Sequence, residues 1–484
     1  MAQIPLTGPW TLVIPEGLYE RLHEHHFPGD GDEHGSVVVA GIAQSADGVR
    51  LLAREIHPAV DGHDYLPGVR GYRMLTAAFV RDHVIACRDE QLVYLAVHNH
   101  HGTDHVAFSD TDLASHEYGY PALLDIVRGQ PLGALVLAER AIAGDIWLPG
   151  GGRAELAQTI IVGRRRRRLT PVPGRRAVAR DPAYDRQARL FGDAGQDILR
   201  RAKIGIIGLG GVGALLAQYL AHLGVGHFIL IDPDRIAISN LSRVVGATRL
   251  DALAWLLAPT WPRFIRELAQ GCARPKVAIA RRTIRRANPG ARVEAIFGDV
   301  LDPAIAAKLV DCDYLFLGAD SMRARLLFNA IVHQYLIPGA QVGAKVRVDA
   351  ATGTLLDVFA VNRPVTPDCG CLWCNQLISR SQLQEEAKSE QERRAQRYID
   401  EPEIAAPSVI TLNATVASQA ANDFMFYMTG LTARAAEQGY QRFAPLARET
   451  WIDHPRKAVE CPECGVGTKS RFARGDARRL PTRL

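Results

Sequence analysis

The glycine-rich stretch at residues 203–243 constrains the fold of this chain more than any other part of the sequence. Residues 204–207 are apolar, a turn with four glycines follows, and an alanine- and leucine-rich run begins at Ala214. This order predicts a buried strand, a tight turn and a helix. Because no side chain covers such a turn, a phosphate can approach the N–H groups at the start of the helix. The turn glycines are Gly208, Gly210, Gly211 and Gly213.

A second apolar strand, at residues 227–231, ends in Asp232. This carboxylate follows the glycines by about twenty residues, the spacing at which it reaches a ribose hydroxyl. The two strands therefore predict a nucleotide site in an α/β sheet. The glycine turn alone fits an NAD-dependent oxidoreductase. However, Asp234, Asn240 and Arg243 follow in the order DPDRIAISNLSR, which adds an amide and a cation that hydride transfer does not need.

In these motifs the chain resembles the ubiquitin-activating superfamily, whose bacterial members ThiF and MoeB adenylate the C-terminal glycine of small β-grasp proteins. The resemblance extends over about residues 184 to 465, and five separated motifs follow the family's order. It implies an α/β fold with a Rossmann-like adenylation domain and a zinc knuckle. It also implies ATP and magnesium as cofactors and a ubiquitin-like protein as the substrate.

The resemblance implies a role for each matching residue. The ribose would bind to Asp232, the magnesium ion to Asp320, and the phosphates to the glycine turn and to Lys276. Arg186 would reach across a homodimer to the partner's nucleotide; the alternative is a helix-start arginine paired with a carboxylate. The implied catalytic residues are Arg186, Arg243, Lys276 and Asp320, and the implied nucleotide-binding residues are Gly208, Gly210, Gly211, Gly213, Asp232, Asp234, Asn240, Arg243 and Lys276.

Further along, Arg325 and Asn329 complete the family's pattern, and the next chemical signal is a set of cysteines. Two Cys-x-x-Cys pairs can close a tetrahedral four-sulfur shell without an open position, so the zinc would be structural. The alternative is two unrelated thiol pairs. Eight cysteines, half of them in these pairs, favour metal binding in a reducing compartment over a disulfide framework. The expected zinc ligands are Cys371, Cys374, Cys461 and Cys464.

Activating enzymes that pass the protein on as a thioester carry a cysteine after the first zinc pair, but residues 375–460 contain none. Three outcomes stay open. The reaction stops at the acyl-adenylate, or a thiol accepts the acyl group, or a hydroxyl such as Ser408 forms an oxyester. The candidate thiols are Cys369, Cys272 and Cys87. The first part of this cysteine-free segment, residues 382–398, is expected to be a charged helix.

The first 162 residues predict a separate, smaller α/β unit. Strands are expected at residues 36–42, 91–97, 133–137 and 159–162, with a helix at residues 74–87. One predicted strand ends in His98 and His100, which lie on the same side of an extended segment because the strand period is two residues. Asp112 could complete a two-histidine, one-carboxylate zinc site with an open position, and Glu33 could act as general base.

These residues resemble the JAMM/MPN (JAB) metalloprotease family, which hydrolyses bonds after ubiquitin-like C-termini. The sequence departs from the family pattern at three points. His101 occupies the usual proline position, eight residues rather than seven separate His100 from Ser109, and Glu33 is one residue out of step. The alternative is a degenerate MPN fold that binds a protein partner without zinc.

The remaining segments carry little chemistry. Residues 163–182 are rich in arginine and proline and are expected to be a linker between the first domain, 1–162, and an adenylation domain, 183–470. Residues 471–484 are expected to be a solvated basic tail. An extra segment, residues 249–270, is amphipathic and broken by Pro259 and Pro262, which predicts two short helices on the surface or at an interface.

Composition limits the possible partners. A formal net charge of +5 is small for 484 residues and gives little support to nucleic-acid binding. No apolar stretch is long enough for a membrane span and no signal peptide is indicated, so we expect a cytoplasmic protein.

The sequence thus predicts an ATP-dependent activating enzyme for a ubiquitin-like protein, in a bacterial conjugation pathway with a conjugating-enzyme-like acceptor downstream. The alternatives are sulfur-carrier activation for cofactor biosynthesis, an NAD-dependent oxidoreductase, or a scaffold with an inactive nucleotide site. A metallo-isopeptidase activity of the first domain would be a second function.

Overall fold

The computed structural model describes residues 8–66, 73–174, 178, 180–349, 352, 354–387, 407–432 and 439–483. The chain divides into two compact units. The first contains Met1–Ala177, His333–Leu336 and Ala458–Arg479, and the second contains Val178–Val332, Ile337–Lys457 and Leu480–Leu484. Each unit is built on its own eight-stranded sheet.

The sheet of the first unit has the strand order β1-β3-β2-β4-β5-β6-β7-β8, and a further pairing of β1 with β7 closes its first seven strands into a ring. The expected strands and helix are confirmed, with ends that differ by a few residues. The strands are β1 (Trp10–Pro15), β2 (Gly35–Ser45), β3 (Gly48–Pro58), β4 (Val93–Asn99), β5 (Leu132–Ala138), β6 (Ala141–Trp147), β7 (Arg153–Val162) and β8 (Arg167–Leu169). The helices are α1 (Glu16–His26), α2 (Ala77–Glu90) and α3 (Asp110–Val127).

Alternating side chains of β2 belong to two different cores. Val38 and Ala40 pack in a cluster with Trp10 of β1, whereas Val37 and Val39 pack on the other side with buried residues of α2 and α3. This alternation follows from the two-residue period of a strand. Apolar residues on both faces therefore explain the nearly continuous hydrophobic run of β2.

Two predictions about the basic segments are wrong. The supposed linker begins with strand β8, which pairs with β7, and Arg167 contacts Glu16 at 3.3 Å. In the supposed solvated tail, Arg471 and Arg474 are only 7% and 8% exposed. Arg474 donates hydrogen bonds to the backbone oxygens of Glu90, at 2.9 Å, and Thr468, at 2.8 Å. Composition indicated charge, but it could not indicate that carbonyl and carboxylate partners were folded against these arginines.

The sheet of the second unit has the order β11-β10-β9-β12-β13-β14-β15-β16. Strands β9 to β13 are parallel, and β13 to β16 pair antiparallel. The strands are β9 (Lys203–Ile207), β10 (His227–Asp232), β11 (Arg292–Phe297), β12 (Tyr314–Leu317), β13 (Gly339–Val348), β14 (Leu355–Val365), β15 (Tyr440–Ala444) and β16 (Glu449–Asp453). The chain runs outward from β9 to β11 and returns to β12 on the other side of β9, so the strand order reverses between β9 and β12. Ligands of open α/β sheets bind at the carboxyl ends of the strands at such a point.

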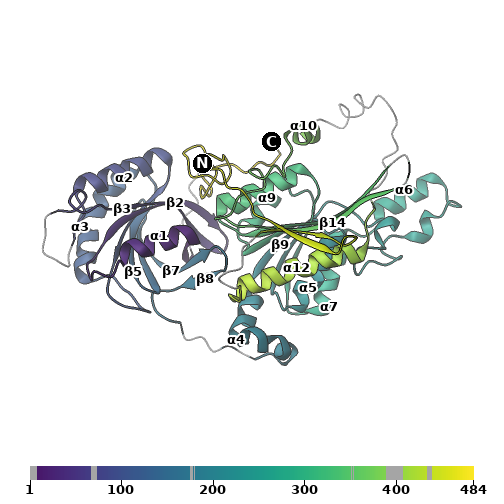
Figure 1. Ribbon diagram of the computed structural model, residues 1–484, viewed down its shortest axis with the longest axis horizontal. Helices are drawn as coiled ribbons and strands as arrows, with labels where there is room; N and C mark the ends of the chain where they lie inside the picture. The colour runs from purple at the N-terminus through teal and green to yellow at the C-terminus, as the bar shows by residue number, and fades with distance from the viewer. Residues whose placement is uncertain are drawn as a thin grey trace. The chain divides into compact units, whose positions relative to one another are not determined.

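Helices cover both faces of this sheet. Figure 1 shows α5, α7 and α12 on one face and α9 on the opposite face. The larger core cluster joins Leu216 of α5 and Phe424 of α12 to Ile206, Leu230 and Phe316 of the central strands. The helices are α4 (Asp185–Arg201), α5 (Gly211–His222), α6 (Arg263–Cys272), α7 (Lys276–Ala287), α8 (Pro303–Ala306), α9 (Met322–Tyr335), α10 (Arg380–Ala387) and α12 (Ile410–Thr429).

The extra segment forms a short 3-10 helix, Ala254–Leu257, followed by α6, which confirms the predicted pair. Several of its large apolar side chains are exposed: Leu250, Trp255, Trp261, Phe264 and Leu268. The charged helix expected at residues 382–398 lies within described residues only as far as the end of α10; positions 388–406 lie outside them. Among the described residues, no helix combines the length and the apolarity that a membrane crossing needs.

Candidate functional site

The predicted glycine turn lies at the carboxyl end of β9 and leads into α5. Gly208 has a positive φ of +87°, which strains any residue with a side chain. A Cβ on Gly213 would lie 1.9 Å from the carbonyl oxygen of Gly208, and a Cβ on Gly208 would lie 2.8 Å from the backbone nitrogen of Ala319 after β12. Glycine is thus required where the turn closes on itself and on the neighbouring strand. Gly210 caps α5 without a side-chain hydrogen bond, so we expect the N–H groups at the start of the helix to bind an anion.

Charged side chains collect at the neighbouring end of β10. The Nζ atom of Lys276, the first residue of α7, lies 2.7 Å from Asp234 Oδ2 and 4.0 Å from Asp232 Oδ1. The backbone N–H of Lys276 also donates to the carbonyl oxygen of Asp234 at 3.0 Å. The structure therefore brings the predicted phosphate-binding lysine and both predicted carboxylates together.

The two aspartates are in different environments. Asp232 is 4% exposed, and its two oxygens accept N–H groups of Leu209, at 2.6 Å, and Asp234, at 2.8 Å. Burial raises the pKa of Asp232, although the nearby Lys276 acts in the opposite direction. The Asp234 side chain is 61% exposed. Asp232 thus fixes the shape of the glycine turn; its contact with a ribose stays a prediction.

Asp320 follows β12, directly across the reversal point from the glycine turn, and its side chain is exposed. Arg325 lies on α9, and its charge faces Asp320. Burial lowers the pKa of Arg325. The structure therefore presents an exposed carboxylate just after β12, as a magnesium ligand requires.

The remaining predicted nucleotide contacts, Arg243, Asn240 and Arg186, differ in their surroundings. Arg243 packs its Cδ atom 3.5 Å from the Cβ position of Gly211 and donates from Nη1 to the Ser239 oxygen at 2.9 Å. Asn240 accepts the N–H of Ala237 through Oδ1. Arg186 is exposed on α4, and within the described residues no hydrogen bond or ion pair joins it to the glycine turn. Arg243 thus lies beside the glycine turn, Asn240 bonds within its own loop, and the Arg186 prediction depends on a second copy of the chain.

One residue at this site was not predicted from the sequence. Asn413, in the first turn of α12, is 3% exposed, and its Nδ2 atom lies 2.2 Å from the Cβ position of Gly211. The same Nδ2 donates to the hydroxyl oxygen of Ser408 at 3.2 Å. No sequence signal sets Asn413 apart, because α12 also carries the amides of Gln419 and Asn422. The contact places Ser408, the predicted oxyester candidate, one side chain away from the glycine turn.

The predicted thiol acceptors differ in accessibility. Cys87 is 1% exposed, and burial raises its pKa to about 12, so it carries almost no thiolate at neutral pH. Burial also raises the pKa of Cys369. Cys272, the last residue of α6, is exposed. Of these three predicted acceptors, Cys272 is therefore the exposed thiol.

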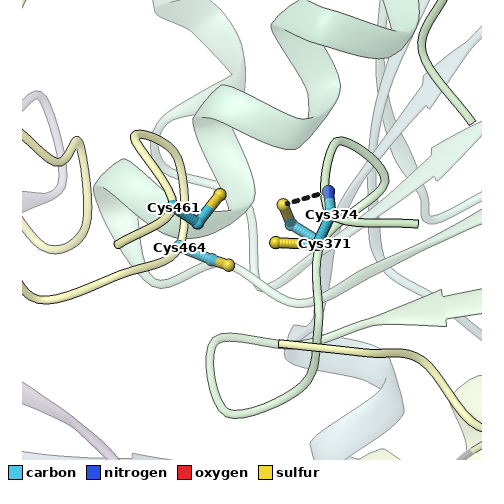
Figure 2. A group of neighbouring side chains, drawn as sticks. All are labelled: Cys371, Cys374, Cys461 and Cys464. Carbon is cyan, nitrogen blue, oxygen red and sulfur yellow. Dashed lines mark hydrogen bonds between the residues drawn. The ribbon is translucent and has the colours of Figure 1, made fainter. Parts of the chain in front are cut away.

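The four predicted zinc ligands lie together. Figure 2 shows the sulfur atoms of Cys371 and Cys374 pointing toward those of Cys461 and Cys464. All four lie within 4.8 Å of one another. The N–H of Cys374 donates to Cys371 Sγ at 3.3 Å, and the N–H of Glu463 donates to Cys461 Sγ at 3.4 Å. Such bonds stabilise thiolates, so this donor set fits a structural zinc ion.

Asn329 supports the first cysteine pair from α9. It is fully buried, and its Oδ1 atom accepts the N–H of Leu372 at 2.9 Å. The family pattern pointed to Asn329 without assigning a contact. Here it holds the backbone between the two cysteines of the first pair.

A second group of possible metal ligands lies in the first unit. His98 and His100, at the end of β4, and Asp112, in the first turn of α3, place ligand atoms within 4.8 Å of one another. The Nε2 atoms of the two histidines lie 3.5 Å and 3.3 Å from Asp112 Oδ2. Burial acts to raise the pKa of Asp112, but hydrogen bonds from His100, His98 and Ser109 outweigh it and lower the pKa. This two-histidine, one-carboxylate set fits a zinc ion with an open position.

Further contacts position this group. His100 Nδ1 lies 3.1 Å from the Ala107 oxygen, which orients Nε2 toward the other ligands. Asn99, between the two histidines in sequence, is 3% exposed. Its amide binds the backbone on both sides of Glu33: Oδ1 accepts the His34 N–H at 2.7 Å, and Nδ2 donates to the Asp32 oxygen at 3.3 Å. Asn99 thus fixes the predicted general base relative to the histidines, a role that the sequence pattern did not indicate.

Comparison with known proteins gives partial matches. Molybdopterin-synthase adenylyltransferase of Escherichia coli is 30% identical over 168 residues, which are 34% of this chain and 59% of that protein. The sulfur carrier protein adenylyltransferase of Thermus thermophilus is 33% identical over 114 residues, 23% of this chain and 35% of that protein. The matched region thus spans less than two thirds of either relative.

A crystal structure of Escherichia coli MccB is 19% identical, with a TM-score of 0.43 over 60% of this chain and 74% of that chain. The sequence profile of the ThiF family matches residues 184–466, which are more than half of the chain. The matched residues include the glycine turn, Lys276, Asp320 and the four clustered cysteines. This chain belongs to the ThiF family.

Proposed function

We propose that this protein adenylates the C-terminal glycine of a small ubiquitin-like protein. An oxygen of the substrate's terminal carboxylate attacks the α-phosphorus of ATP. The bond from that phosphorus to the bridging oxygen breaks, and pyrophosphate leaves with the electron pair. The product is an acyl-adenylate, in which the former carboxylate is activated for transfer.

One observation carries this proposal: the glycine turn, Lys276 and Asp320 meet at the carboxyl ends of β9, β10 and β12, where the strand order reverses. A turn with accessible N–H groups and a lysine can hold a polyphosphate. Membership of the ThiF family supports the same reading, because relatives in the matched region are named adenylyltransferases.

In this proposal each group has one task. The glycine turn and Lys276 bind the phosphates, Asn240 and Arg243 contact the polyphosphate, and Asp232 binds the ribose. Asp320 would hold a magnesium ion, which would offset the charge that builds up on the pyrophosphate. Arg186 would complete the site from the partner in a homodimer.

Exchange of labelled pyrophosphate into ATP tests the proposal. Substituting Asp320→Ala removes one preorganised electrostatic contact, so exchange should fall about a hundredfold to a thousandfold. Asp193→Ala, which removes a surface carboxylate paired with Arg180, is the matched control and should exchange normally. Near-normal exchange in the Asp320 variant would remove that residue from the mechanism. A shift in melting temperature with NAD but not with ATP would instead favour an oxidoreductase.

Among the described candidates for an acyl acceptor, Ser408 is linked to the site by a hydrogen bond. Ser408 contacts Asn413, which lies against the glycine turn. We propose that the reaction either ends at the acyl-adenylate or continues to an oxyester on Ser408. Mass spectrometry after incubation with ATP and substrate distinguishes these outcomes, because only the second leaves a hydroxide-sensitive adduct that Ser408→Ala removes.

We propose a second activity for the first unit, a metallo-isopeptidase acting after a ubiquitin-like C-terminus. The observation that favours it is the convergence of His98, His100 and Asp112, with Glu33 held beside them through Asn99. These three ligands would hold a zinc ion that polarises the scissile carbonyl and lowers the pKa of a bound water. Glu33 would accept the proton of the attacking water.

Metal analysis and cleavage of a linear fusion, a ubiquitin-like protein followed by a peptide, test this activity. The intact protein should bind zinc in excess of what the four-cysteine cluster holds, and His100→Ala should lose that excess. Glu33→Gln should retain the metal and lose cleavage. If the His100 variant binds as much zinc as the wild-type protein, His100 is not a zinc ligand. The first unit would then be a protein-binding domain without this metal site.

Attachment and removal in one chain would suit a bacterial conjugation pathway with a separate conjugating-enzyme-like acceptor. ATP and reduced thiols are supplied by the cytoplasm, and we propose that compartment. Activation of a sulfur carrier uses the same adenylation chemistry. Identification of the small protein that copurifies with the chain distinguishes the two pathways.

A further inference from the structure

Helix α10 makes a contact that the proposed roles do not use. Its Glu386 places a carboxylate on the first residues of α9: Oε1 accepts the N–H of Met322 at 2.8 Å, and Oε2 accepts the N–H of Arg323 at 2.9 Å. These residues are 64 and 63 positions apart in the sequence. The contact is therefore a tertiary cap, made by a segment that lies between the first cysteine pair and Ser408.

The capped end of α9 lies at the crevice. Helix α9 begins two residues after Asp320 and follows the carboxyl end of β12. The backbone of Ala319 lies so close to Gly208 that a Cβ on this glycine would be 2.8 Å from the Ala319 nitrogen. The carboxylate of Glu386 thus occupies N–H donors at the edge of the site where the nucleotide phosphates are proposed to bind.

A partly buried cation interacts electrostatically with the same carboxylate. Arg325 is in the first turn of α9; burial lowers its pKa, and the charges of Asp320 and Glu386 act to raise it. Its Nη1 donates to the Leu377 oxygen at 3.2 Å. Its Nε atom is buried and has no hydrogen-bond partner in the described part of the chain. The two backbone donors and the positive charge of Arg325 favour a carboxylate at this position, and Glu386 occupies it.

We propose that Glu386 is an autoinhibitory carboxylate, which occupies the place at the start of α9 that receives the terminal carboxylate of the substrate protein. This inference rests on the proposed adenylation function. The attacking carboxylate must lie beside the α-phosphate, between the glycine turn and Asp320, and Glu386 carries the same chemical group at that edge. Substrate binding then displaces Glu386 and with it α10, so the empty enzyme is closed to other carboxylates.

Pyrophosphate exchange with a synthetic hexapeptide ending in Gly-Gly tests this competition. Glu386→Gln keeps the shape of the side chain and removes its charge, so KM for the peptide should fall about tenfold while KM for ATP stays unchanged. The matched control is Glu385→Gln, on the exposed side of the same helix, which should leave both constants unchanged. An unchanged or raised peptide KM in the Glu386 variant, with normal exchange, overturns autoinhibition and leaves a helix cap.

Hydrogen exchange provides a readout that does not require turnover. Adding the hexapeptide with a non-hydrolysable ATP analogue should speed the exchange of α10 amides in the wild-type protein, because Glu386 no longer anchors that helix. Undiminished protection of α10 in the peptide complex overturns the displacement. Absence of pyrophosphate exchange in wild-type and variant alike contradicts the adenylation function itself, which distinguishes the two failures.

Discussion

At the glycine turn, the positions of single atoms decide which residues fit. A Cβ on Gly213 would lie 1.9 Å from the Gly208 oxygen, whereas no atom lies within 4 Å of a Cβ on Gly210. The sequence pattern presents the two glycines as equivalent. The structure separates them, because only Gly213 faces backbone that cannot move without opening the turn.

We predict that Gly213→Ala destabilises the protein by about 3 kcal/mol, the cost of forcing an extra carbon into close-packed surroundings. Gly210→Ala is the matched control and should leave the unfolding free energy within about 0.5 kcal/mol of wild type. Urea denaturation measures both. Equal stability of the two variants would contradict the close approach between Gly213 and Gly208.

Asp251 is a second residue whose neighbours determine its behaviour. It is 5% exposed, and its two oxygens accept hydrogen bonds from Arg282 Nη1 at 2.9 Å and Nη2 at 2.7 Å. Burial acts to raise the pKa of Asp251, but hydrogen bonds from Arg282 and Thr248 outweigh it and lower the pKa to about 2. The carboxylate joins the extra segment to α7, the helix that begins with Lys276.

Because the folded pKa of Asp251 lies below its ordinary value of 3.8, its stabilising contribution is complete above that value and is lost as the pH falls toward 2. We predict that Asp251→Asn loses about 2 kcal/mol of unfolding free energy near neutral pH, since it removes the charge of a buried carboxylate that bonds Arg282 and Arg274. The difference from wild type should shrink below about pH 4. If the difference in unfolding free energy between the variant and the wild-type protein does not change with pH, the charge of Asp251 is not its cause.

At the scale of elements, the sequence predicted those features that depend on residues close together in the chain. The glycine turn, Asp232 and Lys276 could be assigned because a strand, a turn and a helix start each leave a signature in neighbouring residues. Asn413 and Glu386 could not be assigned from the sequence, because each contacts an element that is distant in the sequence. Asn413 of α12 lies against the start of α5, and Glu386 of α10 bonds the start of α9. Arg471 and Arg474 were misjudged for the same reason, since their burial depends on distant partners.

The four-cysteine cluster is the element-scale feature with the largest expected effect on stability. A structural zinc ion contributes about 10 kcal/mol or more, which is comparable to the net stability of a domain. We predict that Cys464→Ser lowers the bound zinc and the melting temperature, whereas Cys272→Ser, at an exposed thiol outside the cluster, changes neither. Zinc analysis with thermal denaturation measures both. A fully stable Cys464 variant without zinc would contradict a structural role.

At the scale of the whole molecule, two chemical centres are proposed on two separate sheets. The adenylation centre depends on Lys276 and Asp320, and the proposed hydrolytic centre depends on His98, His100 and Asp112. No described hydrogen bond or ion pair joins the two sets of residues. The two activities should therefore be separable by substitution.

We predict that His100→Ala abolishes fusion cleavage and leaves pyrophosphate exchange within about twofold of wild type, while Asp320→Ala has the opposite pattern. Both assays are run on the full chain with the same substrate protein. Loss of both activities in either variant would contradict independent centres.

The acyl-adenylate is the central intermediate of the proposed function. Incubation of the full chain with ATP, magnesium and its small protein substrate, followed by intact-mass spectrometry, should show AMP attached to the substrate's C-terminal glycine. The adduct should be absent with Asp320→Ala and with a substrate lacking that glycine. A substrate that remains unmodified while the chain binds NAD, or an adduct that forms without the terminal carboxylate, would contradict the proposed function.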